Sequence, residues 1–109
     1  MVNVKPSMSV VREEILGPVL VAQRFDTLDE VAKAANDTSY GLAASIWTKD
    51  ASSMLRLAAK IKAGTVWGNC HAVIDPALPF GFKQSGIGRE QGREGIEAYT
   101  ELKTVIIQL

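Results

Sequence analysis

The stretch that decides the fold is LAASIWTKDASSMLRLAAKIKAGTVWGNC, residues 42–70. Its two ends, residues 42–48 and 65–70, are short apolar runs of the kind that form buried strands. Between them, apolar residues recur at helical spacing after Asp50, which is a good helix N-cap. A helical connection between neighbouring strands implies that the strands are parallel. We therefore predict a strand–helix–strand unit at the centre of the chain.

The alternation of strand and helix extends upstream of this unit. Residues 19–25, VLVAQRF, are a further strand candidate because they begin with a continuous apolar run. Thr27 and Glu30 have the spacing of a capping box, which predicts a helix that ends near residues 36–41. We also expect a short strand within residues 1–11. The sequence thus predicts an α/β fold with a partial parallel sheet and flanking helices.

Two glycines of the central unit lie at positions where glycine has a structural effect. Gly64 stands where the C′ glycine of the central helix belongs. Gly68 lies inside the second strand, where the lack of a side chain weakens β structure.

Downstream of the central unit lies a glycine-rich stretch, PFGFKQSGIGRE, at residues 79–90. It is too irregular for a helix or a strand, and we predict a shaped loop that leads into a helix over residues 88–98. Residues 99–109 have strong β propensity and an apolar end. We expect a terminal strand there, which needs a partner that the rest of the chain does not supply.

Composition excludes several classes of function. The 12 basic and 12 acidic residues give a formal net charge of zero, which argues against a nucleic-acid partner. No stretch is apolar enough to span a membrane, and no cluster of basic residues suggests a membrane surface. Cys70 is the only cysteine, so no intramolecular disulfide can form and a reducing, cytoplasmic setting is expected. One cysteine and one histidine also exclude the usual zinc sites, and we expect no metal.

Two sequence features invite a chemical interpretation and have a simpler one. Cys70 and His71 resemble a nucleophile and its base, but neighbours on a strand point to opposite faces, so a structural role is favoured. Gly86, Gly88 and Gly92 do not have the spacing of a dinucleotide-binding fingerprint, so loop packing is favoured over phosphate binding.

Glu14 and Glu90 are the carboxylates best placed for function. Each lies beside Gly or Pro residues, where loops line sites on α/β scaffolds. Compensation of a helix dipole is the alternative, and the residues alone leave both interpretations open.

Five motifs, in order along the chain, resemble those of NAD(P)-dependent aldehyde dehydrogenases. They are EEILGPV at residues 13–19, YGLAA at 40–44, AGTVWGN at 63–69, PFGFKQSGIGRE at 79–90 and YTELKTV at 99–105. The residues of the fourth motif most resemble those of the phenylacetaldehyde dehydrogenase type. The resemblance covers almost the whole chain but only the C-terminal end of the family's sequence. It implies that residues 1–98 are the C-terminal portion of a catalytic domain and that residues 99–109 are an oligomerisation strand.

The resemblance also implies roles for single residues. Glu14 would accept hydrogen bonds from the nicotinamide ribose hydroxyls. Leu16 would replace an aromatic residue that packs near the nicotinamide, keeping the apolar contact without the flat face. Phe80 would line the aldehyde tunnel, and Glu90 would relay a proton or water. Arg89 and Glu101 would tie the loop to a subunit interface.

Family members oxidise aldehydes to carboxylic acids with NAD or NADP, through a cysteine nucleophile that Cys70 does not match. We therefore expect the chain to be inactive alone and to bind no cofactor by itself, because the nucleophile and the Rossmann-like domain lie upstream. Its expected partners are the aldehyde in the parent enzyme and a homo-oligomer paired through residues 99–109. The alternatives are a non-catalytic interaction module and a degenerate fragment that folds marginally.

The glycine-rich stretch departs from the family pattern in length. Residues 80–83 read FGFK, one residue shorter than F-G-G-x-K. This predicts a strained or shifted loop in which Phe80 and Glu90 are out of register with each other.

Overall fold

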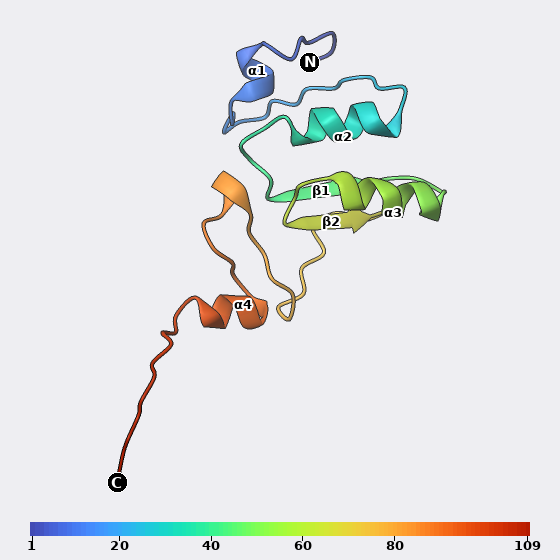
Figure 1. Ribbon diagram of the computed structural model, residues 1–109. Helices are drawn as coiled ribbons and strands as arrows, with labels where there is room; N and C mark the ends of the chain where they lie inside the picture. Colours follow the sequence, from blue (N-terminus) through green and yellow to red (C-terminus); the bar gives the residue numbers. More distant parts are fainter. The chain divides into compact units, whose positions relative to one another are not determined.

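The computed structural model describes every residue from Met1 to Leu109. The chain divides into two compact units, Met1–Thr38 and Ser39–Leu109, and each has its own internal contacts (Figure 1). The second unit contains the sheet, which is small and parallel. The predicted α/β class with flanking helices is therefore confirmed, although the sheet has only two strands.

The first unit holds two helices, α1 over Ser9–Arg12 and α2 over Leu28–Asn36. The predicted capping box is present: Thr27 Oγ1 accepts from the Glu30 N–H, and the Glu30 carboxylate accepts from the Thr27 N–H. Arg12 then ties the unit together. Its guanidinium forms a 3.1 Å ion pair with Asp37 and donates to the carbonyl of Pro6.

Two strands expected in the first unit do not form. Residues 19–25 have no regular secondary structure, and residues 1–11 contain α1 instead of a strand. A buried strand needs neighbours along its edges and covers on its faces. Leu20 is 78% exposed, and the edge contacts of the segment are those with Met1, whose amino group donates to the Leu20 carbonyl and whose carbonyl accepts from the Ala22 N–H.

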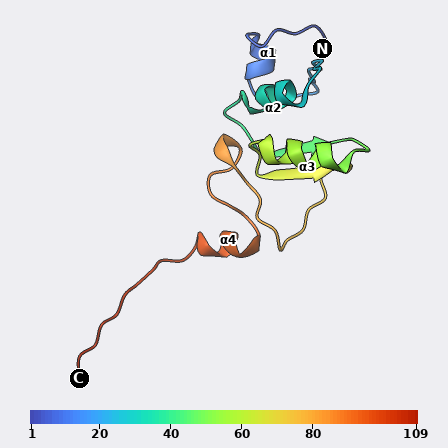
Figure 2. The ribbon, with the colours of Figure 1, turned by 45° about the vertical axis from the view of Figure 1, so that its right-hand side comes forward.

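The second unit is built on the predicted strand–helix–strand unit. Strands β1, Ala43–Ile46, and β2, Thr65–Gly68, pair in parallel with Ala43 opposite Thr65. Helix α3, Ala51–Lys60, connects them and packs on one face of the pair (Figure 2). Its N-cap is Asp50, as predicted, which accepts from the N–H groups of Ser52 and Ser53. Ile46 of β1 and Leu57 of α3 are buried and form the core of this unit.

Gly68 has a packing role that the sequence did not indicate. A Cβ atom at this position would lie 2.3 Å from the sulfur of Met54 in α3. The absent side chain therefore leaves room for the Met54 thioether beside the end of β2.

Gly64 does not end α3. The helix ends at Lys60 with Ile61 as its C-cap, so the predicted C′ role is wrong. A Cβ at Gly64 would lie 2.9 Å from the carbonyl oxygen of Gly81, so Gly64 instead allows the glycine-rich loop to approach β2.

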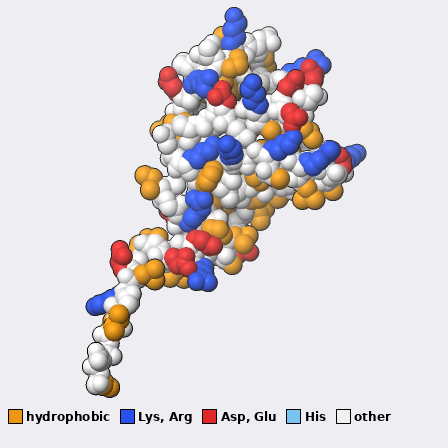
Figure 3. Space-filling view, in the orientation of Figure 1, with side chains coloured by type: hydrophobic (Ala, Val, Ile, Leu, Met, Phe, Trp, Pro, Cys, Tyr) orange, Lys and Arg blue, Asp and Glu red, His pale blue; other side chains and the backbone are white.

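The C-terminal part contains a short 3-10 turn, η1 at Lys83–Ser85, and helix α4 at Gly92–Glu97, which is shorter than predicted. Beyond α4 the chain continues as an extended segment without a strand partner (Figures 1 and 2). Hydrophobic side chains lie exposed along this segment (Figure 3). None of the helices combines the length and apolarity that crossing a bilayer requires.

Candidate functional site

The glycine-rich loop is closed by Phe80 and Glu90. The N–H of Phe80 donates to the carbonyl of Glu90, and the N–H of Glu90 donates to the carbonyl of Phe80, each at 2.8 Å. The two residues therefore face each other as an antiparallel pair. The expectation that the shortened loop holds them out of register is wrong, because the two residues pair directly across it.

Lys83, within the glycine-rich loop, has an unusual backbone conformation. Lys83 has φ of 53°, in the left-handed region that side chains other than glycine rarely adopt. Gly81, nearby, has φ of 111° and is buried. Lys83 therefore begins η1 in a conformation that glycine adopts more easily.

The loop is fastened to the segment that enters β1. Lys83 Nζ donates to the carbonyl of Tyr40 at 3.1 Å, and Ser85 Oγ accepts from the N–H of Gly41 at 3.2 Å. These two contacts link the fourth motif of the sequence to the second. The stretch around Tyr40 and the stretch around Ser85 are therefore in contact, which the sequence alone did not reveal.

Arg89 contacts the loop itself. Its guanidinium carbon lies 5.1 Å from the centroid of the Phe82 ring, and its Nη1 donates to the carbonyl of Gly88. A cation at this distance from an aromatic face is attracted by the ring. Arg89 therefore stiffens the loop within this chain, a role that the sequence did not indicate.

A cavity of about 240 Å³ opens beside the paired residues. Its lining combines one aromatic, two aliphatic, two charged and one hydroxyl-bearing residue with three glycines. The lining residues are Leu42, Phe80, Gly81, Ser85, Gly86, Ile87, Gly88, Arg89 and Glu90. The structure therefore brings together three of the predicted site residues, Phe80, Arg89 and Glu90, at one cavity.

The other predicted site residues lie outside this cavity. Glu14 and Leu16 belong to the first unit; both are exposed, and the Leu16 side chain is 93% exposed. Glu101 is exposed in the extended C-terminal segment.

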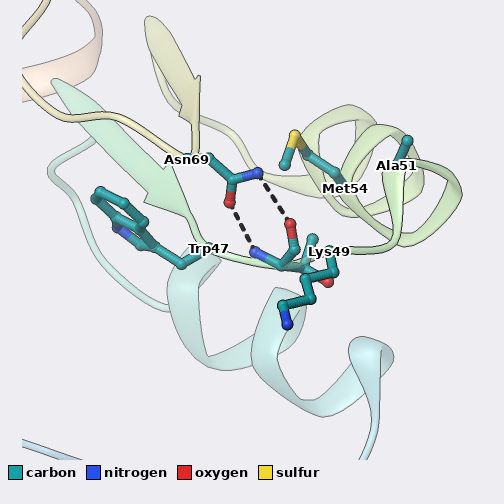
Figure 4. A pocket seen from close by; sticks show the side chains of 6 residues that line it. Trp47, Lys49, Ala51, Met54 and Asn69 are labelled. Carbon is teal, nitrogen blue, oxygen red and sulfur yellow. Dashed lines mark hydrogen bonds between the residues drawn. The ribbon is translucent and has the colours of Figure 1, made fainter.

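A second hollow, of about 400 Å³, lies where β1 and β2 end (Figure 4). Asn69 faces the chain after β1 there: its Oδ1 accepts from the Thr48 N–H, and its Nδ2 donates to the Thr48 carbonyl, both at 2.9 Å. Trp47 and Met54 line the same hollow (Figure 4). Asn69 has φ of 54°, a conformation that Asn tolerates better than most residues. The side chain of Asn69 thus holds the ends of the two strands together.

His71 has a partner other than Cys70. Its Nδ1 lies 2.8 Å from Ser45 Oγ on β1, and its ring meets the Trp67 ring edge-on at 5.3 Å. Cys70 is half-buried. These contacts support the structural interpretation of His71, and a signal for the pair with Ser45 was absent because the two residues are far apart in sequence. No group of three His, Cys, Asp or Glu residues is placed to hold a metal ion.

The parallel strands, the helix that connects them and the closed glycine-rich loop define an α/β protein with a loop-built cavity. A sequence profile of the Aldehyde dehydrogenase family matches residues 1–105. The chain belongs to the aldehyde dehydrogenase family.

Individual relatives agree with this assignment. The chain is 50% identical to Aldehyde dehydrogenase 1A1 of Gallus gallus over 108 residues, which are 98% of this chain and 21% of that protein. It is 49% identical to phenylacetaldehyde dehydrogenase of Pseudomonas fluorescens over 104 residues, 94% of this chain and 21% of that protein. The two values are nearly equal, so identity does not distinguish the phenylacetaldehyde type.

Solved structures show the same fold. The indole-3-acetaldehyde dehydrogenase of P. syringae, in complex with NAD+ and IAA, matches with a TM-score of 0.89 and 45% identity. The match covers 99% of this chain and 22% of that one. The NAD+ complex of an aldehyde dehydrogenase from Bacillus cereus also has a TM-score of 0.89, with 48% identity over 95% of this chain and 21% of that one. The chain thus spans about a fifth of the length of the relatives that it matches.

Proposed function

We propose that this chain forms the C-terminal portion of the catalytic domain of an NAD(P)-dependent aldehyde dehydrogenase, which oxidises aldehydes to carboxylic acids. The observation that carries the proposal is the pairing of Phe80 with Glu90 beside one cavity. An aromatic wall and a carboxylate at a fixed separation suit a site that receives an apolar aldehyde and moves a proton. Membership of the family supports the reaction class.

Each paired residue has a role that follows from its chemistry. Phe80 lines the path of the aldehyde, since its ring offers an apolar surface. Glu90 is exposed at the cavity, and its carboxylate accepts a proton from water or hands one on. The two backbone hydrogen bonds between Phe80 and Glu90 fix the separation of these residues.

The cofactor contacts come from the first unit. The Glu14 carboxylate is an acceptor for two ribose hydroxyls, and Leu16 offers an apolar contact to the nicotinamide. NAD(P)+, when bound, accepts the hydride that leaves the aldehyde carbon. We propose that the chain alone binds no cofactor, because a dinucleotide needs the glycine-rich βαβ fold that residues 1–109 do not contain.

The chain alone is proposed to be inactive. An acyl intermediate requires an activated nucleophile, and the only thiol, Cys70, does not match the family's nucleophile, while Nδ1 of the neighbouring His71 is engaged with Ser45. The remainder of the parent enzyme would supply the nucleophile. The single free cysteine fits a reducing compartment, and we propose the cytoplasm.

The proposal is tested by a graft. Residues 1–105 replace the matching segment of the P. syringae indole-3-acetaldehyde dehydrogenase, and aldehyde-dependent NADH formation is measured. The graft is expected to be active, Glu90→Gln is expected to lower kcat by about a hundredfold, and Phe80→Ala is expected to raise KM for the aldehyde. Glu94→Gln, in α4 and outside the cavity, is the matched control. A folded but inactive graft, or turnover by the purified 109-residue chain, would count against the proposal.

A second candidate function is an interaction module, and one observation favours it. The segment at residues 99–109 is exposed and partly apolar; Leu102, Ile106 and Leu109 have exposed fractions of 104%, 89% and 116%. We propose that this segment pairs with a sheet of another subunit, with Arg89 and Glu101 at the contact, as an oligomerisation strand would. Sedimentation of the chain, alone and mixed with a full-length relative, tests this: a persistent monomer that captures no relative excludes it.

A further inference from the structure

The loop after β2 is strained and is held by side chains from the sheet. Asn69 and Ala72 have φ of 54° and 56°, although neither is glycine. Left-handed conformations of this kind persist only where surrounding contacts fix them, and they occur often at functional sites. We therefore follow the contacts that fix this loop, from the sheet at its start to the glycine-rich loop at its end.

Three anchors hold the start of the loop. The N–H of Asn69 donates to the carbonyl of Ile46 at 2.8 Å. Trp67 Nε1 donates to the carbonyl of Val73 at 2.8 Å. His71 Nδ1 meets Ser45 Oγ at 2.8 Å, and the His71 ring packs edge-on against Trp67.

The far end of the loop is tied to the closed glycine-rich loop. Asp75 organises a turn by accepting from the N–H groups of Ala77 and Leu78. The carbonyl of Pro76 accepts from the N–H of Gly92 at 3.0 Å, next to the Phe80–Glu90 pair. Residues 69–80 therefore form a strap that runs from the sheet to that pair and is fixed at both ends.

We infer that His71 is a positioning residue, which holds this strap on β1 and thereby sets the place of Phe80 and Glu90. His71 does not line the cavity, so it acts through the strap and not on the substrate. Trp67 limits the orientation of the imidazole, and Ser45 supplies the polar contact. The inference rests on the proposed function for its catalytic consequence, but its structural part is independent of it.

The test uses the full chain and hydrogen exchange. His71→Ala is expected to speed exchange of the Phe80, Glu90 and Gly92 amides roughly fivefold, the effect of one lost hydrogen bond. The amides of α3 are expected to keep their rates, whereas a general loss of stability would speed them equally. His71→Asn, which keeps a polar atom near the position of Nδ1, is expected to restore the slow rates. Ser45→Ala combined with His71→Ala is expected to do no more than either alone.

The grafted dehydrogenase supplies the catalytic readout. His71→Ala is expected to lower kcat about fivefold, in line with the lost hydrogen bond, with KM for NAD+ unchanged. If the amides respond but the parent graft oxidises no aldehyde, the strap stands and the proposed function fails. If the graft is active and His71→Ala leaves the Phe80 and Glu90 amides unchanged, the inference is overturned, whatever happens to kcat.

Discussion

Phe80 and Glu90 exchange two backbone hydrogen bonds, each 2.8 Å long, across the mouth of the glycine-rich loop. The aromatic ring and the carboxylate are thus held by the main chain and not by contacts between their side chains. Substitution of either side chain should therefore alter chemistry without moving its partner. The role of each side chain can therefore be tested by substituting it alone.

Glu90→Pro is expected to open the loop. Proline has no N–H, so the bond to the Phe80 carbonyl is lost, and the fixed φ of proline is poorly matched to the paired backbone. Exchange of the Phe80 amide, measured by NMR, is expected to rise at least about tenfold. Glu90→Gln keeps the N–H and serves as the control; equal exchange in the two variants would contradict the pairing.

Gly68→Ala is expected to destabilise the second unit by no more than about 1 kcal/mol, because the Met54 thioether that the new Cβ would meet lies near the end of a flexible side chain and can move aside. The free energy of unfolding in urea measures the effect. The penalty comes from one contact, so shortening the partner should remove much of it.

The matched double variant, Gly68→Ala with Met54→Ala, tests that reasoning. The loss for the pair is expected to be smaller than the sum of the two single losses. Strict additivity would show that the contact between α3 and β2 does not limit what Gly68 can become.

Asp50, the N-cap of α3, makes the stability of this helix depend on pH. The hydrogen bond from the Ser53 hydroxyl lowers the pKa of Asp50 below its ordinary value of 3.8, and the N–H groups of Ser52 and Ser53 and the charge of Arg56 act in the same direction. Partial desolvation opposes them. A carboxyl group whose pKa is lower in the folded state contributes stability above its unfolded pKa and loses it as the pH falls through the folded value.

The advantage of the natural chain over Asp50→Asn is therefore expected to be full well above pH 3.8 and to be lost as the pH falls below that value. Thermal unfolding at a series of pH values measures it. Asn is also a good N-cap and does not titrate, so it isolates the charge. A difference in Tm that stays constant down to acid pH would refute the assignment.

Ile106→Lys is expected to weaken self-association of the chain. Ile106 is 89% exposed in the extended C-terminal segment, and a charge on a strand edge is unfavourable for pairing. Sedimentation velocity at several concentrations is expected to show at least about tenfold weaker association, since a buried lysine costs more than 1.4 kcal/mol. Gln108→Lys, which adds the same charge without removing an apolar side chain, is the control.

The elements that could be predicted from the sequence are those that local chemistry specifies. Thr27 with Glu30, and Asp50 with the residues after it, form their caps within one turn, so spacing alone reveals them. The two strands that formed lie on either side of one helix. Residues 19–25 failed as a strand because strand formation depends on neighbours, and local apolarity does not supply them.

The candidate site was predicted in part for the same reason. The stretch that carries Phe80 and Glu90 was recognisable by its glycines and by its resemblance to the family, but the pairing across the loop is a tertiary fact. The contacts of Ser85 with Gly41 and of His71 with Ser45 join residues far apart in sequence, and no local pattern announces them. The role of Gly64 was misjudged because it depends on the loop backbone that approaches this glycine, which is distant in sequence.

The side-chain amide of Asn69 replaces a backbone peptide group beyond the last paired residues of β1 and β2. It offers Thr48 one acceptor and one donor. The end of the sheet is therefore sensitive to any change that removes this amide, such as deamidation. Deamidation would replace the Nδ2 donor with a second oxygen that faces the Thr48 carbonyl, so that attraction becomes repulsion. The same change of a single atom would loosen the start of the strap, and storage alone would thereby act on the segment that leads to Phe80.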